Sequence, residues 1–256
     1  MKKWFIIPIL IFVCQIGTSA QNVITSNKPT ICIIGGTPST ANILMSLPDS
    51  LKTKYNLISF NRPGYGGTQN HIMSDELLFK LARKAGLRDN DYGVIGISGG
   101  GPLAILLASK FNLKHCGVVS GMVSRDAFFA FADSAVTKDL MESVINGKDS
   151  FSQTIRKFPH LDEILKQAES TNQETAIVAS YDDLHYILSD ALYKSIKNKN
   201  LKIDWWHGEK DNNVPFRSAE YFLKDYKNAK LNIIPDATHG IDSRIYVGQI
   251  IQQWKN

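Results

Sequence analysis

A serine set among glycines is the residue of this sequence best placed to do chemistry. Ser98 lies in Gly96-Ile97-Ser98-Gly99-Gly100, after an apolar run and directly before a helix-forming run that starts at Pro102. The pattern Gly-x-Ser-x-Gly is typical of a sharp turn between a strand and a helix, which projects the serine hydroxyl clear of its own backbone. Free N–H groups at the start of that helix would stabilise negative charge beside the hydroxyl. Ser98 is therefore a candidate nucleophile.

A serine nucleophile needs a base and a group that orients the base. Of the six histidines, His239 is the candidate base, because it follows the last expected strand. The candidate acid is Asp211, in the loop after the preceding expected strand, with the neighbouring Glu209 as the alternative. Asp236 is close to His239 in sequence, and a role in a turn explains it more simply. The candidate triad is therefore Ser98, Asp211 and His239.

These three residues need a scaffold that brings distant loops together. Short apolar runs alternate with helical patterns, which predicts an α/β protein with a mainly parallel sheet and helices on both faces. The strands are expected at residues 30–34, 56–60, 92–97, 115–119, 202–207 and 230–234. In such sheets ligands bind beyond the carboxyl ends of the strands. The loops Gly35–Ser39, Asn61–Thr68 and Gly96–Pro102 follow three of these strands, so they are expected to converge on one edge.

Helices are expected between these strands, and one segment between the fourth and fifth strands is longer than a single connecting helix. Residues 39–54, 74–85, 218–226 and 241–254 have helical patterns, and Ser74 is a plausible N-cap. Residues 125–199 show helical patterning with no clear strand, which predicts a helical insertion large enough to form a cap. An apolar pocket is expected beneath it, for which the candidate residues are Met122, Phe128, Phe129, Phe131 and Tyr186.

Several segments together resemble motifs of the α/β-hydrolase superfamily, in particular of the compact type with a helical cap. The order Ser98, Asp211, His239 is that family's order. The resemblance runs from about Thr30 to the C-terminus, apart from the cap. Besides the serine turn, the matching segments are Asn61–Thr68 (Asp-Arg-Pro-Gly-Tyr-Gly-x-Ser in the family), Gly35–Ser39 (His-Gly-x-Pro-Gly), Gly208–Pro215 (the acid loop) and Thr238–Gly240 (the histidine loop).

The resemblance implies a role for each candidate residue. Ser98 would attack the substrate, His239 would act as general base and then general acid, and Asp211 would orient His239. The backbone N–H groups of Thr37 and Gly99 would bind the oxyanion. Relatives with this fold that are dehalogenases or epoxide hydrolases use Asp as the nucleophile, so Ser98 argues against both.

The chain also departs from the family's pattern. Gly35 stands where the family usually has His, Asn61 where it has Asp, and Thr68 where it has Ser. The first two strands of the family are absent or shortened into residues 21–29. None of these changes removes a triad candidate, and the oxyanion donors are backbone groups. The glycine at position 35, in place of the family's histidine, can change how rigidly the oxyanion loop is held.

The first twenty residues are expected to be a cleaved secretory signal. Lys2 and Lys3 precede an apolar run over Trp4–Val13, and Thr18-Ser19-Ala20 offers a cleavage site. The run is shorter than the roughly 20 residues that span a bilayer. Cys14 lacks the preceding small residue of a lipoprotein site, so a lipid anchor is less favoured. The expected organisation is a signal at 1–20, a core at 21–124 and 200–256, and a cap at 125–199, in a secreted or periplasmic protein without stable membrane insertion.

Composition argues against several other classes of protein. The net charge of +5 comes from scattered Lys and Arg residues, so no nucleic-acid footprint is expected. No Cys/His cluster has zinc-ligand spacing and no phosphate-binding loop occurs, so neither a metal nor an organic cofactor is expected. Cys32 and Cys116 lie in apolar runs and are expected to be buried structural thiols.

The sequence thus favours a serine hydrolase that cleaves an ester or amide bond of a small acyl substrate through an acyl-enzyme. One alternative is a peptidase resembling proline iminopeptidases, in which Asp182 and Asp183 of the cap could bind an N-terminal amine. A solvated helix start explains these two residues more simply. The other alternative is a ligand-binding protein of the same fold with little turnover.

Overall fold

Six parallel strands form the sheet of this protein in a computed structural model, which describes residues 28–158, 161–170, 172–241 and 243–254. The order across the sheet is β2-β1-β3-β4-β5-β6, and every neighbouring pair is parallel. The expected signal at 1–20 lies outside the described residues, as do 21–27. The strands are β1 (Thr30–Ile34), β2 (Asn56–Ile58), β3 (Gly93–Ile97), β4 (His115–Val119), β5 (Ile203–Gly208) and β6 (Ala229–Ile234).

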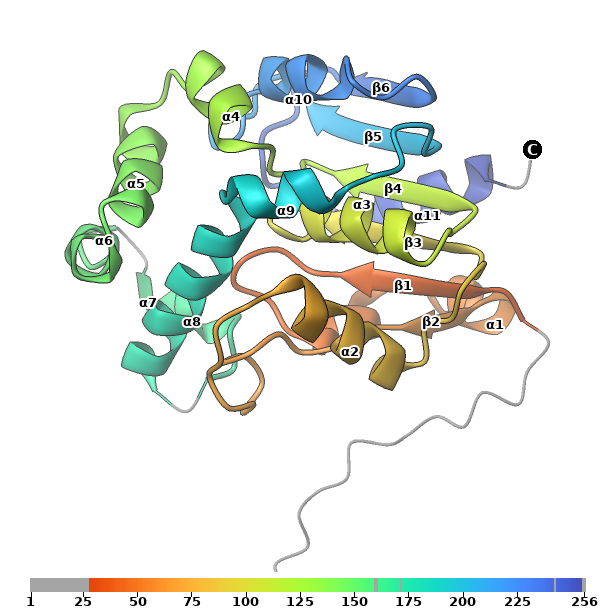
Figure 1. Cartoon of the computed structure of the whole chain (residues 1–256), viewed down its shortest axis with the longest axis horizontal. Coiled ribbons are helices and arrows are strands. Elements are labelled where there is room, and N and C mark those ends of the chain that lie inside the picture. Colours follow the sequence, from red (N-terminus) through yellow and green to blue (C-terminus); the bar gives the residue numbers. More distant parts are fainter. Residues whose placement is uncertain (1–27, 159–160, 171, 242, 255–256) are drawn as a thin grey trace, which may run out of the picture.

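Helices cover both faces of the sheet, which confirms the predicted fold class. Figure 1 shows α2 and α3 in front of the sheet and α1 and α11 behind it. Side chains of β1 alternate accordingly, as they must in a strand buried on both faces. Ile31 and Ile33 pack with residues of α1 and α11, whereas Cys32 and Ile34 pack with residues of α2 and α3. The helices of this part are α1 (Asp49–Lys54), α2 (Asp75–Ala85), α3 (Gly100–Lys110), α10 (Phe216–Leu223) and α11 (Ser243–Gln253).

Helix boundaries follow the local chemistry. The single helix expected over 39–54 is instead a 3₁₀ helix, η1 (Ala41–Ser46), followed by α1, because Pro48 disfavours a helical conformation at the residue before it. Ser74 is the N-cap of α2, as predicted, and its hydroxyl accepts the Leu77 N–H at 3.3 Å. Gly86 ends α2 with a φ of 111°, a conformation that glycine adopts without strain.

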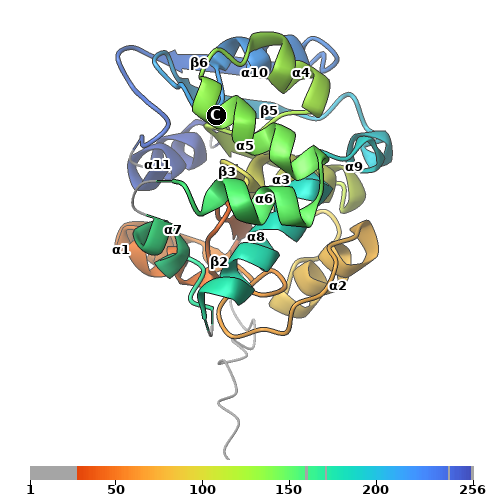
Figure 2. The same ribbon diagram turned by 90° about the vertical axis from the view of Figure 1, so that its left-hand side faces the viewer.

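The helical insertion predicted at 125–199 contains no strand within its described residues. Helices α5 to α8 lie at the carboxyl ends of the strands, as Figures 1 and 2 show from two directions, and α9 returns to pack against α3. The insertion therefore stands over the sheet edge on which the candidate residues were expected to meet. Its helices are α4 (Arg125–Phe131), α5 (Ala135–Ile145), α6 (Lys148–Ile155), α7 (Leu161–Lys166), α8 (Gln173–Ile187) and α9 (Asp190–Ser195).

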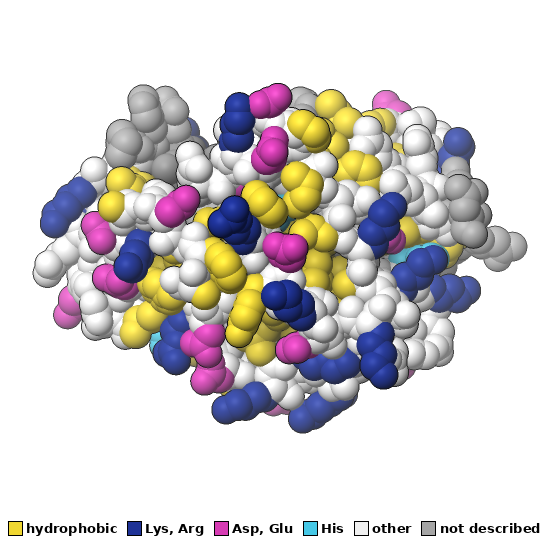
Figure 3. Space-filling model, turned by 90° about the horizontal axis from the view of Figure 1, so that it is seen from above, with side chains coloured by type: hydrophobic (Ala, Val, Ile, Leu, Met, Phe, Trp, Pro, Cys, Tyr) yellow, Lys and Arg dark blue, Asp and Glu magenta, His cyan; other side chains and the backbone are white. Residues whose placement is uncertain are grey.

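Two further expectations concern cysteines and the surface. Cys32 and Cys116 are buried, as predicted, and both are free thiols. Burial raises the pKa of Cys32 to about 12. The Cys32 thiol is therefore protonated and unreactive at neutral pH. Figure 3 shows Lys and Arg side chains interspersed with Asp and Glu and with apolar side chains on one face. Within the described ranges, no helix has the length and apolar character needed to cross a bilayer.

Candidate active site

Ser98 occupies the sharp turn between β3 and α3 that the glycine pattern predicted. Its φ is 49°, in the left-handed region, and its N–H donates to the Val119 carbonyl at 2.9 Å. The flanking glycines are required by close backbone approach. A Cβ at Gly96 would lie 2.2 Å from the Gly100 carbonyl oxygen, and one at Gly100 would lie 2.4 Å from the Ile34 carbonyl oxygen. The turn therefore depends on Gly-x-Ser-x-Gly for steric reasons.

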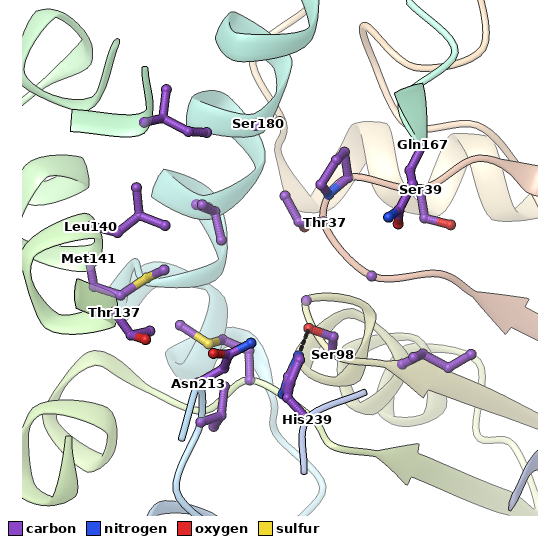
Figure 4. A pocket seen from close by; sticks show the side chains of 18 of the residues that line it. Thr37, Ser39, Ser98, Thr137, Leu140, Met141, Gln167, Ser180, Asn213 and His239 are labelled. Carbon is purple, nitrogen blue, oxygen red and sulfur yellow. Dashed lines mark hydrogen bonds between the residues drawn. The ribbon is translucent and has the colours of Figure 1, made fainter. Parts of the chain in front are cut away.

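The structure brings the three candidate triad residues together at the carboxyl edge of the sheet. Ser98 Oγ lies 3.0 Å from His239 Nε2, the contact drawn in Figure 4, and His239 Nδ1 lies 2.8 Å from Asp211 Oδ2. Asp211 follows β5 and His239 follows β6, so each side chain comes from a different loop. The alternative acid Glu209 is exposed and accepts the Asp236 N–H instead, at 3.2 Å.

Asp211 is buried, yet it is fully supplied with hydrogen-bond donors. Its Oδ1 accepts the N–H groups of Asn213 and Val214, both at 2.9 Å, and its Oδ2 faces His239 and His207. Burial by itself would raise the pKa of Asp211. The hydrogen bonds from His207 and His239 outweigh burial and hold that pKa well below its usual range. The carboxyl group is therefore an anion at neutral pH.

His207 is a second histidine beside the same carboxylate, and it was not among the residues predicted for the site. It is fully buried, and its Nδ1 accepts the indole N–H of Trp205 at 2.9 Å. The ring proton is therefore on Nε2, which lies 2.6 Å from the Val214 carbonyl oxygen and 3.0 Å from Asp211 Oδ2. The available signal was its position at the end of β5, on the same face of the strand as Trp205 and four residues before Asp211.

The low pKa of Asp211 predicts how stability depends on pH. Because the folded pKa lies below the unfolded value of about 3.9, the stabilisation from this carboxylate is complete above about pH 4 and is lost as the pH falls further. Denaturant unfolding of wild type and Asp211→Asn from pH 7 to pH 2 measures this contribution to the free energy of unfolding. The difference in free energy of unfolding should stay constant to about pH 4 and then shrink. A difference that already shrinks between pH 7 and pH 5 would contradict the assignment.

Thr37 and Gly99, the predicted oxyanion donors, lie side by side next to Ser98. A Cβ at Gly99 would lie 2.4 Å from Thr37 Oγ1, and one at Gly36 would lie 3.1 Å from Ser98 Cβ. Within the part of the chain that the structure describes, neither the Thr37 nor the Gly99 N–H donates to a protein acceptor. Two free donors thus stand beside the candidate nucleophile, which is the arrangement that stabilises a tetrahedral oxyanion.

Solved structures match the described fold over nearly its whole length. An esterase from Exiguobacterium antarcticum has a TM-score of 0.65 at 14% identity and covers 89% of this chain and 92% of its own. An α/β-hydrolase enzyme from a Medee basin deep-sea metagenome library has a TM-score of 0.64 at 15% identity, with 90% of each chain covered. A bromoperoxidase from Bacillus anthracis has a TM-score of 0.61 at 17% identity, covering 90% and 92%.

The chain has the α/β-hydrolase fold. This confirms the resemblance that the sequence motifs indicated. No protein-family model and no curated protein matches the sequence. Because the solved α/β-hydrolases differ in chemistry and have low identity to this chain, they show its fold and leave its activity to be argued from the site.

Within this α/β-hydrolase fold, the place of the family's usual histidine is taken by Gly35. A Cβ at Gly35 would lie 2.3 Å from Ser39 Oγ, so the Ser39 side chain occupies the space that a larger residue would need. A larger residue at position 35 would therefore require the Ser39 side chain to move.

A cavity of about 490 Å³ opens onto Ser98 and His239, between the loops of the α/β-hydrolase core and helices α5 to α8 (Figure 4). Among the described residues, no Asp, Glu, Lys or Arg side chain lines it, and the polar groups are neutral hydroxyls and amides besides His239. The apolar lining is formed by Pro38, Ile43, Ile97, Met122, Leu140, Met141, Phe151, Ile155, Phe158, Leu165, Leu184 and Val214.

The pocket is apolar, as predicted, but most of the residues proposed for it lie elsewhere. Of the sequence candidates, Met122 lines the cavity. Phe128 is buried in the core against Phe129, Phe131 contacts Tyr221, and Tyr186 donates a hydrogen bond to Asp75. Aromatic residues mark buried positions in a sequence, but they do not indicate which helix face points into a cavity.

Asp182 and Asp183 also differ from their expected place at a solvated helix start. Both lie in the middle of α8, and Asp183 is buried, with its Oδ2 3.0 Å from Nη2 of Arg62. Asp182 accepts the amide N–H of Asn70 at 3.4 Å. Neither carboxylate lines the cavity, so neither is placed to receive a substrate amine. No group of three His, Cys, Asp or Glu residues in the described ranges is arranged to hold a metal ion.

Proposed function

We propose that this protein is a serine hydrolase that cleaves an ester or amide bond through an acyl-enzyme on Ser98. The observation that carries the proposal is the continuous series of hydrogen bonds from Ser98 through His239 to Asp211, beside two free N–H groups. A structural role would not require an ionised, buried carboxylate behind a histidine that contacts a serine in a strained turn.

The geometry suggests how acylation would proceed. As Ser98 Oγ attacks the substrate carbonyl carbon, His239 Nε2 takes the hydroxyl proton. The carbonyl oxygen becomes an oxyanion that accepts hydrogen bonds from the Thr37 and Gly99 N–H groups. Asp211 keeps the other ring proton on His239 Nδ1, so the Nε2 lone pair faces Ser98, and its charge stabilises the imidazolium that forms.

The same groups would complete acylation and then carry out deacylation. His239 gives its proton to the leaving alcohol or amine as the tetrahedral intermediate collapses, which leaves the acyl group on Ser98. A water molecule then attacks the acyl carbonyl carbon and transfers a proton to His239, and the carboxylic acid departs as Ser98 regains its proton.

The cavity favours a substrate with a neutral, apolar acyl group. A charged acyl group would lose its hydration there without meeting a partner of opposite charge, which is costly. The same reasoning disfavours an N-terminal peptide amine, because no carboxylate of the described residues lines the cavity. We therefore favour a carboxylesterase-like activity over a proline-iminopeptidase-like one, with residues 125–199 acting as the cap that shapes the acyl site.

We also propose that the protein is secreted or periplasmic. The support is the basic start, the short apolar run and the small residues Thr18-Ser19-Ala20, which together are typical of a cleaved signal. Mass spectrometry of the protein exported by a bacterial host would identify the mature N-terminus.

Active-site labelling tests the proposed activity. A fluorophosphonate probe should add its mass to Ser98 in the purified mature protein, and Ser98→Ala and His239→Ala should each abolish labelling. Ser180→Ala is the matched control, because Ser180 also lines the cavity but its hydroxyl donates to the Ala176 carbonyl. Labelling at another serine, or no labelling of folded protein, would refute an activated Ser98.

A further inference from the structure

Arg62 connects the oxyanion loop to the helical insertion through a buried guanidinium. Its Nη1 donates to the Gly35 carbonyl oxygen at 2.8 Å and its Nη2 to the Gly36 carbonyl oxygen at 2.5 Å. On the other side, its Nε donates to Asp183 Oδ2 at 3.1 Å. Arg62 and Asp183 are 2% and 3% exposed, so this ion pair is shielded from water. One planar group thus holds two consecutive carbonyls of the oxyanion loop and a carboxylate of α8.

The bond to the Gly36 carbonyl determines where the Thr37 N–H points. The Gly36–Thr37 peptide is trans, and the C=O and N–H of a trans peptide point in opposite directions. Holding the Gly36 oxygen against Arg62 therefore turns the Thr37 N–H away from Arg62. That N–H has no protein acceptor among the described residues, so it remains available to a substrate oxygen.

Asp183 holds the same loop through a second contact. The Thr37 hydroxyl donates a hydrogen bond to Asp183 Oδ2, and the Tyr65 hydroxyl lies 3.4 Å from the same oxygen. The segment before α8 also contacts η1, because the Glu169 carboxylate accepts a hydrogen bond from the side-chain amide of Asn42 at 2.7 Å. The position of α8 and the conformation of residues 35–37 are therefore coupled through one carboxylate.

We propose that Arg62 and Asp183 are positioning residues that hold the Thr37 N–H in place as an oxyanion donor. The oxyanion hole is then complete only when α8 is packed against the oxyanion loop. The proposal rests on the proposed function of Ser98. It assigns the insertion a role in transition-state stabilisation besides shaping the acyl site. Neither residue touches the reacting atoms, and both act through the loop.

The kinetic test uses variants that keep the shape of the pair. Asp183→Asn retains size and an acceptor oxygen but removes the charge, and Arg62→Lys retains the charge but loses the planar fork. Each should lower kcat for a neutral ester roughly 10- to 100-fold with KM changed less than about threefold, since a misaligned oxyanion donor weakens only the transition state. Binding of a trifluoromethyl ketone, which forms an oxyanion on serine, should weaken in parallel with kcat/KM.

Asp182→Asn is the matched control, because Asp182 lies on the same helix, accepts a hydrogen bond from the exposed Asn70 and does not line the cavity. It should retain wild-type kcat. If Asp183→Asn and Arg62→Lys fold and match the kcat of this control, the proposal is wrong. A fall in kcat accompanied by an equal loss of substrate binding would also overturn it, because general damage to the site would then explain the result.

Amide hydrogen exchange tests the pinning of the loop without relying on turnover. Peptides that cover residues 35–40 should exchange faster in Asp183→Asn than in wild type or in Asp182→Asn. Unchanged exchange would overturn the proposal even if activity fell. If wild type shows no Ser98-dependent hydrolysis, the proposed function fails, and the catalytic role assigned to the pair fails with it, while the exchange result still decides whether the pair holds the loop.

Discussion

Ser98→Ala should lower kcat for hydrolysis of a neutral p-nitrophenyl ester by a factor of about 10⁶, the loss seen when the nucleophile of a serine protease is removed. Ser98 Oγ is the hydroxyl that lies 3.0 Å from His239 Nε2, and no other described serine or threonine contacts that nitrogen. Without it there is no oxygen for His239 to activate, and the covalent intermediate cannot form.

The variant should also keep its fold. Ser98 already has a φ of 49°, and alanine bears the same backbone strain at this position, so we expect the free energy of unfolding to change by less than about 1 kcal/mol. Steady-state kinetics with a matched thermal unfolding curve measure both effects. Hydrolysis by Ser98→Ala at the wild-type rate would refute the acyl-enzyme mechanism, whereas residual slow hydrolysis near the detection limit agrees with it.

Asp211→Asn should lower kcat by a factor of about 10⁴ through the wrong tautomer of His239. The amide oxygen of the new side chain is expected at the Oδ1 position, because two backbone N–H groups, those of Asn213 and Val214, donate there. The amide NH₂ then faces His239 Nδ1 and donates to it. The ring proton of His239 must move to Nε2, which can no longer accept the proton of Ser98.

The environment of His207 strengthens this expectation. His207 is held with its proton on Nε2 by the Trp205 indole, so it can only donate toward the position of Asp211 Oδ2. An NH₂ group there would face a donor, and this leaves the variant strained as well as inactive. Steady-state kinetics should show the loss mainly in kcat, and nitrogen chemical shifts of His239 report its tautomer.

Glu209→Gln is the matched control for Asp211→Asn, because it removes a neighbouring carboxylate that accepts the Asp236 N–H and does not contact His239. It should retain full activity. A loss of less than tenfold in Asp211→Asn, or an equal loss in Glu209→Gln, would show that Asp211 does not orient the base.

The order of elements and the three candidate catalytic residues were predictable because they depend on local rules. The Gly96–Gly100 pattern is required by backbone contacts within one turn, and β-branched runs such as Thr30–Ile34 predict strands buried on both faces. A parallel sheet then places every loop that follows a strand on one edge, so Ser98, Asp211 and His239 were expected on the same edge once the sheet was predicted.

Contacts between distant side chains depended on the tertiary structure. Arg62 and Asp183 are 121 positions apart, and their sequence neighbourhoods resemble a surface loop and a polar stretch of helix. In the folded protein, α8 brings Asp183 against Arg62, and the two side chains form a buried ion pair. The cavity lining was undetermined for the same reason, because helical patterning predicts that α5 and α6 exist but not which of their faces points toward Ser98. The sequence by itself determined the fold and the candidate catalytic residues through local geometry, whereas the docking of the helical insertion decided what holds those residues in place and what lines the cavity beside them.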